Sequence, residues 1–215
     1  MNFMNKQFIK GGLAVFVAAS FAASAVAQQE VVVYDNTSTN LGQFVSNVGE
    51  VGDEFRPSGT ARTMTRFDFQ TFSGNLDGDE QLTLRFYEIT NPSASNFQVG
   101  NLLYQHSPIS VQNGNQVHII TGLNVNLAPV NLWTIEVSNL DAGDVAGLVV
   151  FDGPSVGASF DDFVIEQNGT FELATLALNG AGANFAARVT AVPEPATVAL
   201  GALGLVAMLG LRRRK

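Results

Sequence analysis

Three closely spaced carboxylates are the residues best suited to metal chemistry. Asp77, Asp79 and Glu80 lie in one short segment with a glycine between the two aspartates. Calcium prefers hard oxygen ligands of this kind, presented by a loop. Asn75, Asp77 and Asp79 alternate as in the first half of an EF-hand loop, but Phe86 occupies the twelfth position, where that loop needs glutamate. The segment is a candidate calcium site, and the alternative is a solvated hairpin turn.

Two other acidic groups are Asp161–Asp162 and the pair Asp141 and Asp144. Glycoside hydrolysis needs two carboxyl groups at a defined separation. Nineteen acids are present in the chain, but no spacing between them singles out such a pair. The sequence therefore gives no specific evidence for a glycosidase.

One serine lies in a nucleophile-like motif. Residues 153–157 read Gly-Pro-Ser-Val-Gly, which fits the G-x-S-x-G elbow of α/β-hydrolases. That elbow requires a helix after the serine and a histidine later in the chain. Residues 157–162 are a poor helix start, and both histidines, His106 and His118, precede Ser155. We expect a turn between strands at this motif, and a chain that is not an enzyme.

Other cofactor motifs are absent from the sequence. The chain contains no cysteine, which excludes cysteine nucleophiles, iron–sulfur clusters and cysteine-based zinc sites. The two histidines are twelve residues apart without a third, so we expect structural roles for both. No P-loop or dinucleotide fingerprint occurs. Apart from the candidate calcium site, no cofactor is expected.

Charge is distributed unevenly along the chain. Between residues 28 and 195, five arginines against nineteen acids give a net charge of −14, and this region has no lysine. Such a surface repels nucleic acid and anionic lipid headgroups, so neither is an expected partner of the folded part.

Strand patterns dominate between residues 28 and 191. Residues 65–72 alternate, with Phe67 and Phe69 on one face and polar residues on the other. Period-two alternation predicts half-buried strands. It recurs at Leu82, Leu84 and Phe86, and again at Trp133, Ile135 and Val137, opposite Thr134 and Glu136. Further strands are predicted at 31–34, 101–104, 117–121, 145–151, 162–166, 171–178 and 185–190.

Turn residues separate these predicted strands. The strongest hairpin signal is Asn168-Gly169, and other turn pairs occur at Asp77-Gly78, Asn113-Gly114 and Asn179-Gly180. No long amphipathic helix is predicted in this region. About ten short strands joined by such turns predict an all-β domain over 28–191, an antiparallel β-sandwich of jelly-roll-like form.

The N-terminus has the three regions of a secretory signal peptide. Lys6 and Lys10 supply the positive charge, and residues 11–23 form the apolar segment. Ala25 and Ala27 fit an A-x-A cleavage site, which predicts a signal peptide over 1–27 and a mature chain beginning at Gln28. An uncleaved membrane anchor is the alternative.

The C-terminus combines a turn, an apolar segment and a cationic end. Pro193, Glu194 and Pro195 predict an extended, exposed segment. Residues 196–211 are uncharged and, as a helix, measure about 24 Å, which is at the short limit for crossing a bilayer. The positive-inside rule places the last four residues in the cytoplasm; they are Arg212, Arg213, Arg214 and Lys215. We expect at least a transient membrane association, and a buried core helix is the alternative.

These three parts over 192–215 resemble the PEP-CTERM sorting signal of Gram-negative bacteria. The resemblance implies recognition by exosortase, a membrane cysteine transpeptidase, with cleavage near Pro193-Glu194-Pro195. It also implies export through the inner membrane to the cell surface or extracellular matrix, and an association with exopolysaccharide and biofilm.

The folded region resembles choice-of-anchor domains, small exported β-domains with interchangeable C-terminal anchors. The matching segments are 33–36, 61–69, 133–135, 157–162 and 184–189. The resemblance supplies no catalytic residues. The expected function is that of a non-enzymatic surface or matrix protein. The alternatives are a calcium-dependent carbohydrate-binding module or adhesin and, less favoured, a secreted hydrolase.

Overall fold

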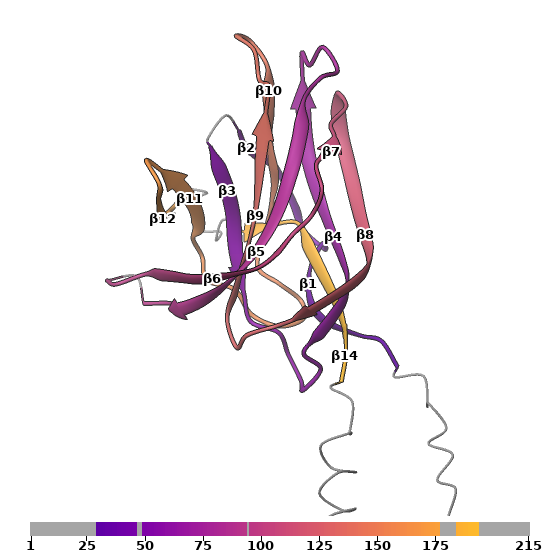
Figure 1. Ribbon diagram of the computed structural model, residues 1–215, viewed down its shortest axis with the longest axis vertical. Coiled ribbons are helices and arrows are strands. Elements are labelled where there is room, and N and C mark those ends of the chain that lie inside the picture. Colours follow the sequence, from indigo (N-terminus) through magenta and orange to yellow (C-terminus); the bar gives the residue numbers. More distant parts are fainter. Residues whose placement is uncertain (1–28, 47–48, 94, 177–183, 194–215) are drawn as a thin grey trace, which may run out of the picture.

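The computed structural model describes residues 29–46, 49–93, 95–176 and 184–193 (Figure 1). Every regular element in these ranges is a β-strand, and all the strand pairs are antiparallel. The prediction of an all-β antiparallel fold is therefore confirmed. The likeness to a jelly roll stays a prediction.

The first sheet is built around the long strand β4 (Thr63–Gly74). One edge of β4 pairs along its length with β8 (Gly114–Asn126). The other edge pairs first with β14 (Ala187–Val192) and then with β10 (Val145–Phe151). The remaining strands of this sheet lie outside β14 and β10; they are β1 (Val31–Asn36), β2 (Asn40–Ser46) and β13 (Asn184–Phe185).

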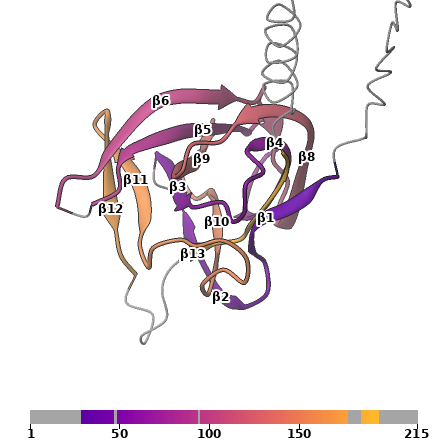
Figure 2. The ribbon, with the colours of Figure 1, turned by 90° about the horizontal axis from the view of Figure 1, so that it is seen from below.

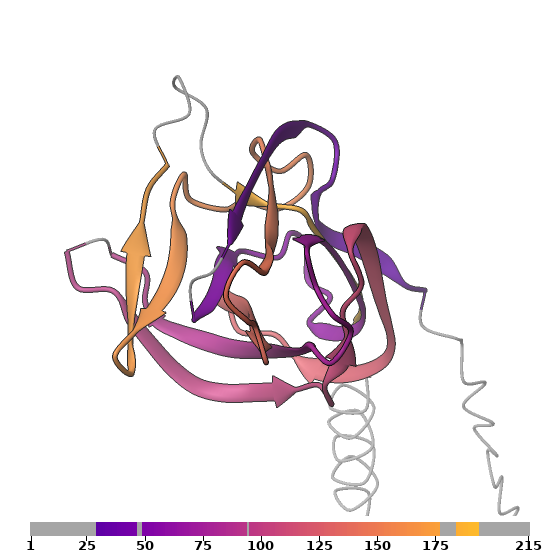
Figure 3. The ribbon, with the colours of Figure 1, turned by 90° about the horizontal axis from the view of Figure 1, so that it is seen from above.

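The second sheet is centred on β9 (Asn131–Ser138), which pairs with β3 (Glu50–Phe55) and β5 (Gln81–Asn91). Beyond β3 lie β11 (Phe163–Gln167) and β12 (Thr170–Ala174). Beyond β5 lie β6 (Gln98–Gln105) and the short β7 (Ile109–Ser110). Figures 2 and 3, which view the domain from below and from above, show the strands of the two sheets on opposite sides of the middle of the domain.

Aromatic side chains from both sheets fill the space between them. Phe67 of β4 meets Phe86 of β5 at 4.8 Å and Trp133 of β9 at 5.1 Å between ring centres. Phe69 and Phe185 also pack against Trp133. All five side chains are almost completely buried. The alternation that predicted these strands therefore marks the residues that join the two sheets.

The predicted hairpin at Asn168-Gly169 is confirmed. Gln167 pairs with Thr170 across the turn, so the loop contains two residues. Their φ angles are 54° and 81°, the positive values that a type I′ turn requires at both positions. The strand predicted over 171–178 ends at Ala174, which pairs with Phe163, the first residue of its partner β11. The predicted turn at Asn179-Gly180 lies outside the described residues.

Three strands were not predicted, namely β2, β3 and β7. β3 is the important omission, because its sequence Glu-Val-Gly-Asp-Glu-Phe looks like a charged loop. In the structure Asp53 and Glu54 are both fully buried in a central part of the second sheet. Thr134, expected opposite the core face of β9, is buried as well, and its hydroxyl donates to a carboxylate oxygen of Glu50.

Candidate functional site

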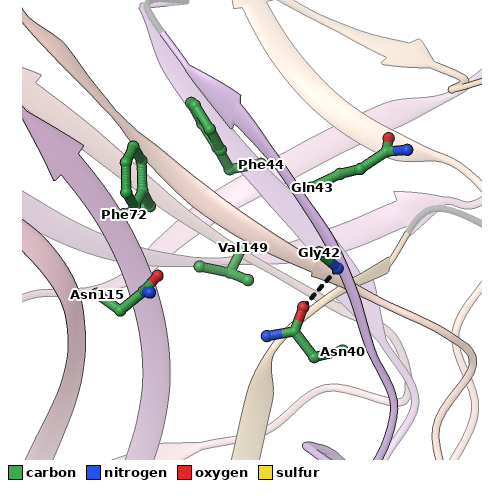
Figure 4. A pocket seen from close by; sticks show the side chains of 7 residues that line it. All are labelled: Asn40, Gly42, Gln43, Phe44, Phe72, Asn115 and Val149. Atoms are coloured by element: carbon green, nitrogen blue, oxygen red, sulfur yellow. Dashed lines mark hydrogen bonds between the residues drawn. The ribbon is translucent and has the colours of Figure 1, made fainter.

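A small pocket lies on the first sheet, with two aromatic rings at one side. Phe44 of β2 and Phe72 of β4 have ring centres 4.4 Å apart and planes inclined at 37°. The pocket has a volume of about 220 Å³ and is open to solvent. Figure 4 shows the two rings and the amides around it. Its lining residues come from β2, β4, β8 and β10; they are Asn40, Gly42, Gln43, Phe44, Phe72, Asn115 and Val149.

A bulge in β2 shapes one wall of this pocket. Val150 of β10 pairs with Gln43, but the next residue, Phe151, pairs with Asn40, so β2 contains extra residues here. The Asn40 side-chain oxygen accepts the Gly42 N–H at 2.7 Å, and Gly42 has a φ of 69°. A glycine suits this left-handed conformation, and such a bulge redirects the neighbouring side chains.

The chemistry of the pocket lining is neutral. The Phe44 side chain remains exposed (41%), and it offers an apolar ring surface to a ligand. Asn40, Gln43 and Asn115 offer amide groups that both donate and accept hydrogen bonds. No ionisable side chain belongs to this lining. The pocket is therefore suited to bind a neutral polar molecule that has apolar faces, and it contains no group for acid–base catalysis.

The predicted calcium ligands converge at one end of the domain. One carboxylate oxygen from each of Asp77, Asp79 and Glu80 lies within 4.8 Å of the others. Glu80 is buried, and its two oxygens accept the N–H groups of Asp77 and Gly78 at 3.0 Å each. Glu80 thus closes the turn, whereas the two aspartates are exposed to solvent.

The acidic pair Asp141 and Asp144 belongs to the loop next to this turn. The Asn139 side chain donates to the Asp79 carbonyl at 2.9 Å, which connects the β9–β10 loop to the β4–β5 loop. An Asp144 oxygen accepts the Asp141 N–H at 2.7 Å. Partial desolvation, followed by the charge of Asp77, raises the pKa of Asp79. A cation at this acidic end would relieve the crowding of like charges.

Ser155 lies in an irregular segment that is bound to β1. Its N–H donates to the Asp35 carbonyl at 2.8 Å, and its hydroxyl donates to the same oxygen at 3.2 Å. His118 is on β8, where its Nε2 lies 2.9 Å from the Thr71 hydroxyl and its ring stacks on Phe69. The His106 Nδ1 lies 2.6 Å from the Ser107 carbonyl oxygen. Residues 153–157 form bends in the connection between β10 and β11, with a bridge from Val156 to Asp35, and the hydrogen bonds of Ser155 given above do not involve either histidine.

A buried acidic group on β3 was missed by sequence reasoning. Asp53 and Glu54 lie against residues 157–162, and Ser159 contacts both carboxyl groups. Burial raises the pKa of Asp53 well above its usual value, with Glu54 as the second cause. Burial, followed by the charge of Asp162, raises the pKa of Glu54 to about 7. The only signal in the sequence was a pair of adjacent acids followed by Phe55, which does not reveal burial.

Most of the predicted sorting residues lie outside the described ranges. Pro193 is exposed and directly follows β14. Glu194, Pro195 and the cluster 212–215 lie outside the described residues, as do Ala25 and Ala27 of the predicted signal peptide. The part of the chain that the structure describes holds no helix of the length and apolar character needed to span a membrane.

Comparison with known proteins identifies the C-terminal segment. Residues 191–215 match the family model of the PEP-CTERM protein-sorting motif. No curated protein and no solved structure matches the chain. The match begins in the last residues of β14 and includes the predicted Pro-Glu-Pro segment, apolar stretch and cationic end. The motif marks the chain as an exported protein that exosortase sorts to the cell surface.

Proposed function

We propose that the β-domain is a non-enzymatic, surface-sorted matrix protein that binds extracellular polysaccharide in the pocket beside Phe44 and Phe72. The observation that carries this proposal is the pair of rings next to three amide side chains. A sugar ring has C–H faces that pack on aromatic rings, and its hydroxyl groups exchange hydrogen bonds with amides. A neutral lining suits uncharged sugar units.

The position of the pocket in the fold agrees with this function. Thr63, at the start of β4, pairs with Val192. Val192 is the last residue of β14, and the sorting motif continues beyond it. Phe72 lies nine residues further along β4, about 30 Å away at ~3.3 Å per residue. The pocket is therefore far from the end of the domain where the sorting segment leaves, and a polymer can reach it while that segment is at a membrane.

The test is a binding measurement with polysaccharide isolated from the producing cells. We expect Phe44→Ala to lower the affinity about tenfold or more, which corresponds to ~1.4 kcal/mol. Asn115→Ala is expected to weaken binding as well. Leu102→Ala is the matched control, because Leu102 is an exposed apolar residue (49%) on the other sheet. Equal affinities for wild type and Phe44→Ala would exclude this pocket as the binding site.

A second candidate function is that of a calcium-dependent adhesin. It is favoured by the convergence of Asp77, Asp79 and Glu80 at the end of the domain opposite the sorting segment. In this case polysaccharide affinity falls when calcium is removed with a chelator, and Asp79→Asn abolishes the calcium dependence. Asp152→Asn is the control, because Asp152 is an exposed acid of a different turn. Affinity that does not respond to calcium contradicts this candidate.

A further inference from the structure

A second acidic group lies inside the domain, where residues 157–162 cross β3. Arg56 and Ala158 form a bridge, with N–H to carbonyl distances of 2.8 and 3.1 Å. Gly157 has a φ of 78°, and a Cβ placed there would lie 2.7 Å from the Arg56 carbonyl oxygen. The close approach of this segment places Asp162 near the side chain of Glu54. The charge of Asp162 contributes to the raised pKa of Glu54.

Protein donors satisfy only part of this group. The Phe160 N–H donates to Glu54 Oε1 at 2.7 Å, and the Phe185 N–H donates to Asp53 Oδ2 at 2.9 Å. The Ser159 hydroxyl lies 3.3 Å from Asp53 Oδ1 and donates to the Glu54 carbonyl at 2.5 Å. Glu54 Oε2 and Asp162 Oδ1 are buried and accept no hydrogen bond from the other described residues, and the two carboxyl groups can hydrogen-bond to each other only when one of them holds a proton.

An independent polar group points into the same region. Tyr34 is completely buried, and its hydroxyl forms no hydrogen bond that meets the usual geometry. The hydroxyl faces Ser159 and Asp53: burial raises the pKa of Tyr34, and the charge of Asp53 adds to this increase. Buried polar groups are normally paired, so unpaired oxygens on Tyr34, Glu54 and Asp162 indicate a missing positively charged or hydrogen-bonding partner.

The described residues contain no cation that neutralises these carboxyl groups. Three of the five arginines there form ion pairs with other acids, at Arg66–Asp68, Arg85–Glu50 and Arg188–Asp35. The Arg56 guanidinium lies over the Phe160 ring, 4.2 Å from its centre, and Arg62 donates to the Ala61 carbonyl. Buried carboxylates without a cation are costly, so these carboxyl groups either hold protons, in line with the raised pKa of Asp53 and Glu54, or take up a cation from outside the chain.

We propose that Glu54 and Asp162, together with the Tyr34 hydroxyl, form a buried binding site for a divalent metal ion, and that calcium is the preferred ion. The free atoms are all hard oxygens, and calcium accepts irregular sets of carboxylate, carbonyl and water oxygens. Glu54 belongs to β3 and Asp162 immediately precedes β11, so the ion connects the β11–β12 hairpin to the centre of the second sheet. The site is distinct from the exposed group at Asp77, Asp79 and Glu80.

The test uses the full chain, purified in mild detergent and freed of metal with a chelator. Its melting temperature and its bound calcium are measured as calcium chloride is added. Ligand binding to the folded state stabilises it by RT ln(1 + [L]/Kd), so calcium at 100 times Kd raises the melting temperature measurably. We expect wild type to show this rise, and Asp162→Asn to bind one calcium ion fewer with a smaller rise.

Two further variants separate this site from the exposed acidic end. Glu54→Gln removes a buried charge, so it is expected to be at least as stable as wild type in chelator and to lose the same calcium ion. Asp79→Asn is expected to keep that ion. The proposal is overturned if calcium fails to raise the wild-type melting temperature, or if Asp162→Asn and Glu54→Gln retain the full wild-type response.

Discussion

Val31, the first residue of β1, pairs with Ala191 near the end of β14. The two strands that border the predicted signal peptide and the sorting motif are therefore neighbours in one sheet. β14 also pairs with β4 on its other side, so it is an interior strand of the sheet. Because the sorting motif match begins at residue 191, the motif overlaps a strand that the domain needs for folding.

This overlap predicts how far the chain can be shortened. A chain ending at Pro193 keeps all of β14 and is expected to unfold at the same temperature as the full chain. A chain ending at Arg188 loses the buried Val189 and Ala191 and leaves β1 and β4 without part of their common partner. We expect it to lose at least about 3 kcal/mol of stability. Thermal unfolding measures the difference, and equal stability of the two chains would contradict the pairing.

Processing predicts the ends of the mature protein. Mass spectrometry of material from the cell surface should find Gln28 at the start and an end near Pro195. A mature chain that still carries Arg212–Lys215 would instead show that the segment is a permanent anchor. Replacing both Pro193 and Pro195 with alanine is expected to leave the domain folded, because both residues follow the last strand. The same double substitution is expected to block processing, because it removes the Pro-Glu-Pro motif.

Gly52 of β3 marks a close approach between β3 and β9. A Cβ at this position would lie 1.8 Å from the Trp133 carbonyl oxygen, a main-chain atom that cannot move alone. Gly52→Ala is therefore expected to cost more than about 3 kcal/mol, above the usual range for overpacking. Gly74→Ala is the control, because no atom lies within 4 Å of a Cβ there. Chemical denaturation compares the two, and similar small losses would show that β3 and β9 are further apart.

Sequence patterns were sufficient for the strands whose core residues alternate. Phe67 and Phe69 of β4 and Trp133 and Ile135 of β9 lie where the alternation placed them. β3 was missed because Asp53 and Glu54 are buried, contrary to the usual exposure of acids. Their burial depends on donors from residues 159, 160 and 185, more than 100 residues away, which no local pattern reveals.

The candidate sites were predictable to different extents. The grouping of Asp77, Asp79 and Glu80 could be predicted because the three residues lie within four consecutive positions of the chain. The contact of their turn with the loop containing Asp141 follows from the pairing of Gly74 with Val145. The pocket could not be predicted from the sequence, because Phe44 and Phe72 belong to separate strands. They lie side by side because β10 pairs with both β2 and β4.

The turn between β11 and β12 predicts a local stability effect. Asn168 has a φ of 54°, which costs most residues about 1–2 kcal/mol. Asn168→Ala is expected to destabilise the hairpin by about this amount, whereas Asn168→Gly removes the steric cost and is expected to be tolerated. Hydrogen exchange of the β11 and β12 amides measures the effect. Equal exchange in both variants would contradict a type I′ turn.

His118 predicts how stability depends on pH. Its ring stacks on Phe69 at 4.6 Å between ring centres and lies beside the Thr71 hydroxyl, and burial lowers its pKa. The unfolded chain, with a histidine pKa of about 6.5, therefore binds a proton more readily than the folded chain does. The stability associated with neutral His118 is complete above pH ~6.5 and is lost as the pH falls from there towards the lowered pKa.

The corresponding measurement is the melting temperature at pH 7.5 and pH 5 for wild type, His118→Gln and His106→Gln. Glutamine retains a partner for Thr71 but has no charge to gain, so His118→Gln is expected to lose less stability on acidification than wild type. His106→Gln serves as the control, because His106 is only half-buried outside the core and is expected to behave as wild type does. An identical acid response in wild type and His118→Gln would show that protonation of His118 does not oppose folding, and that the acid sensitivity of the domain arises from other groups.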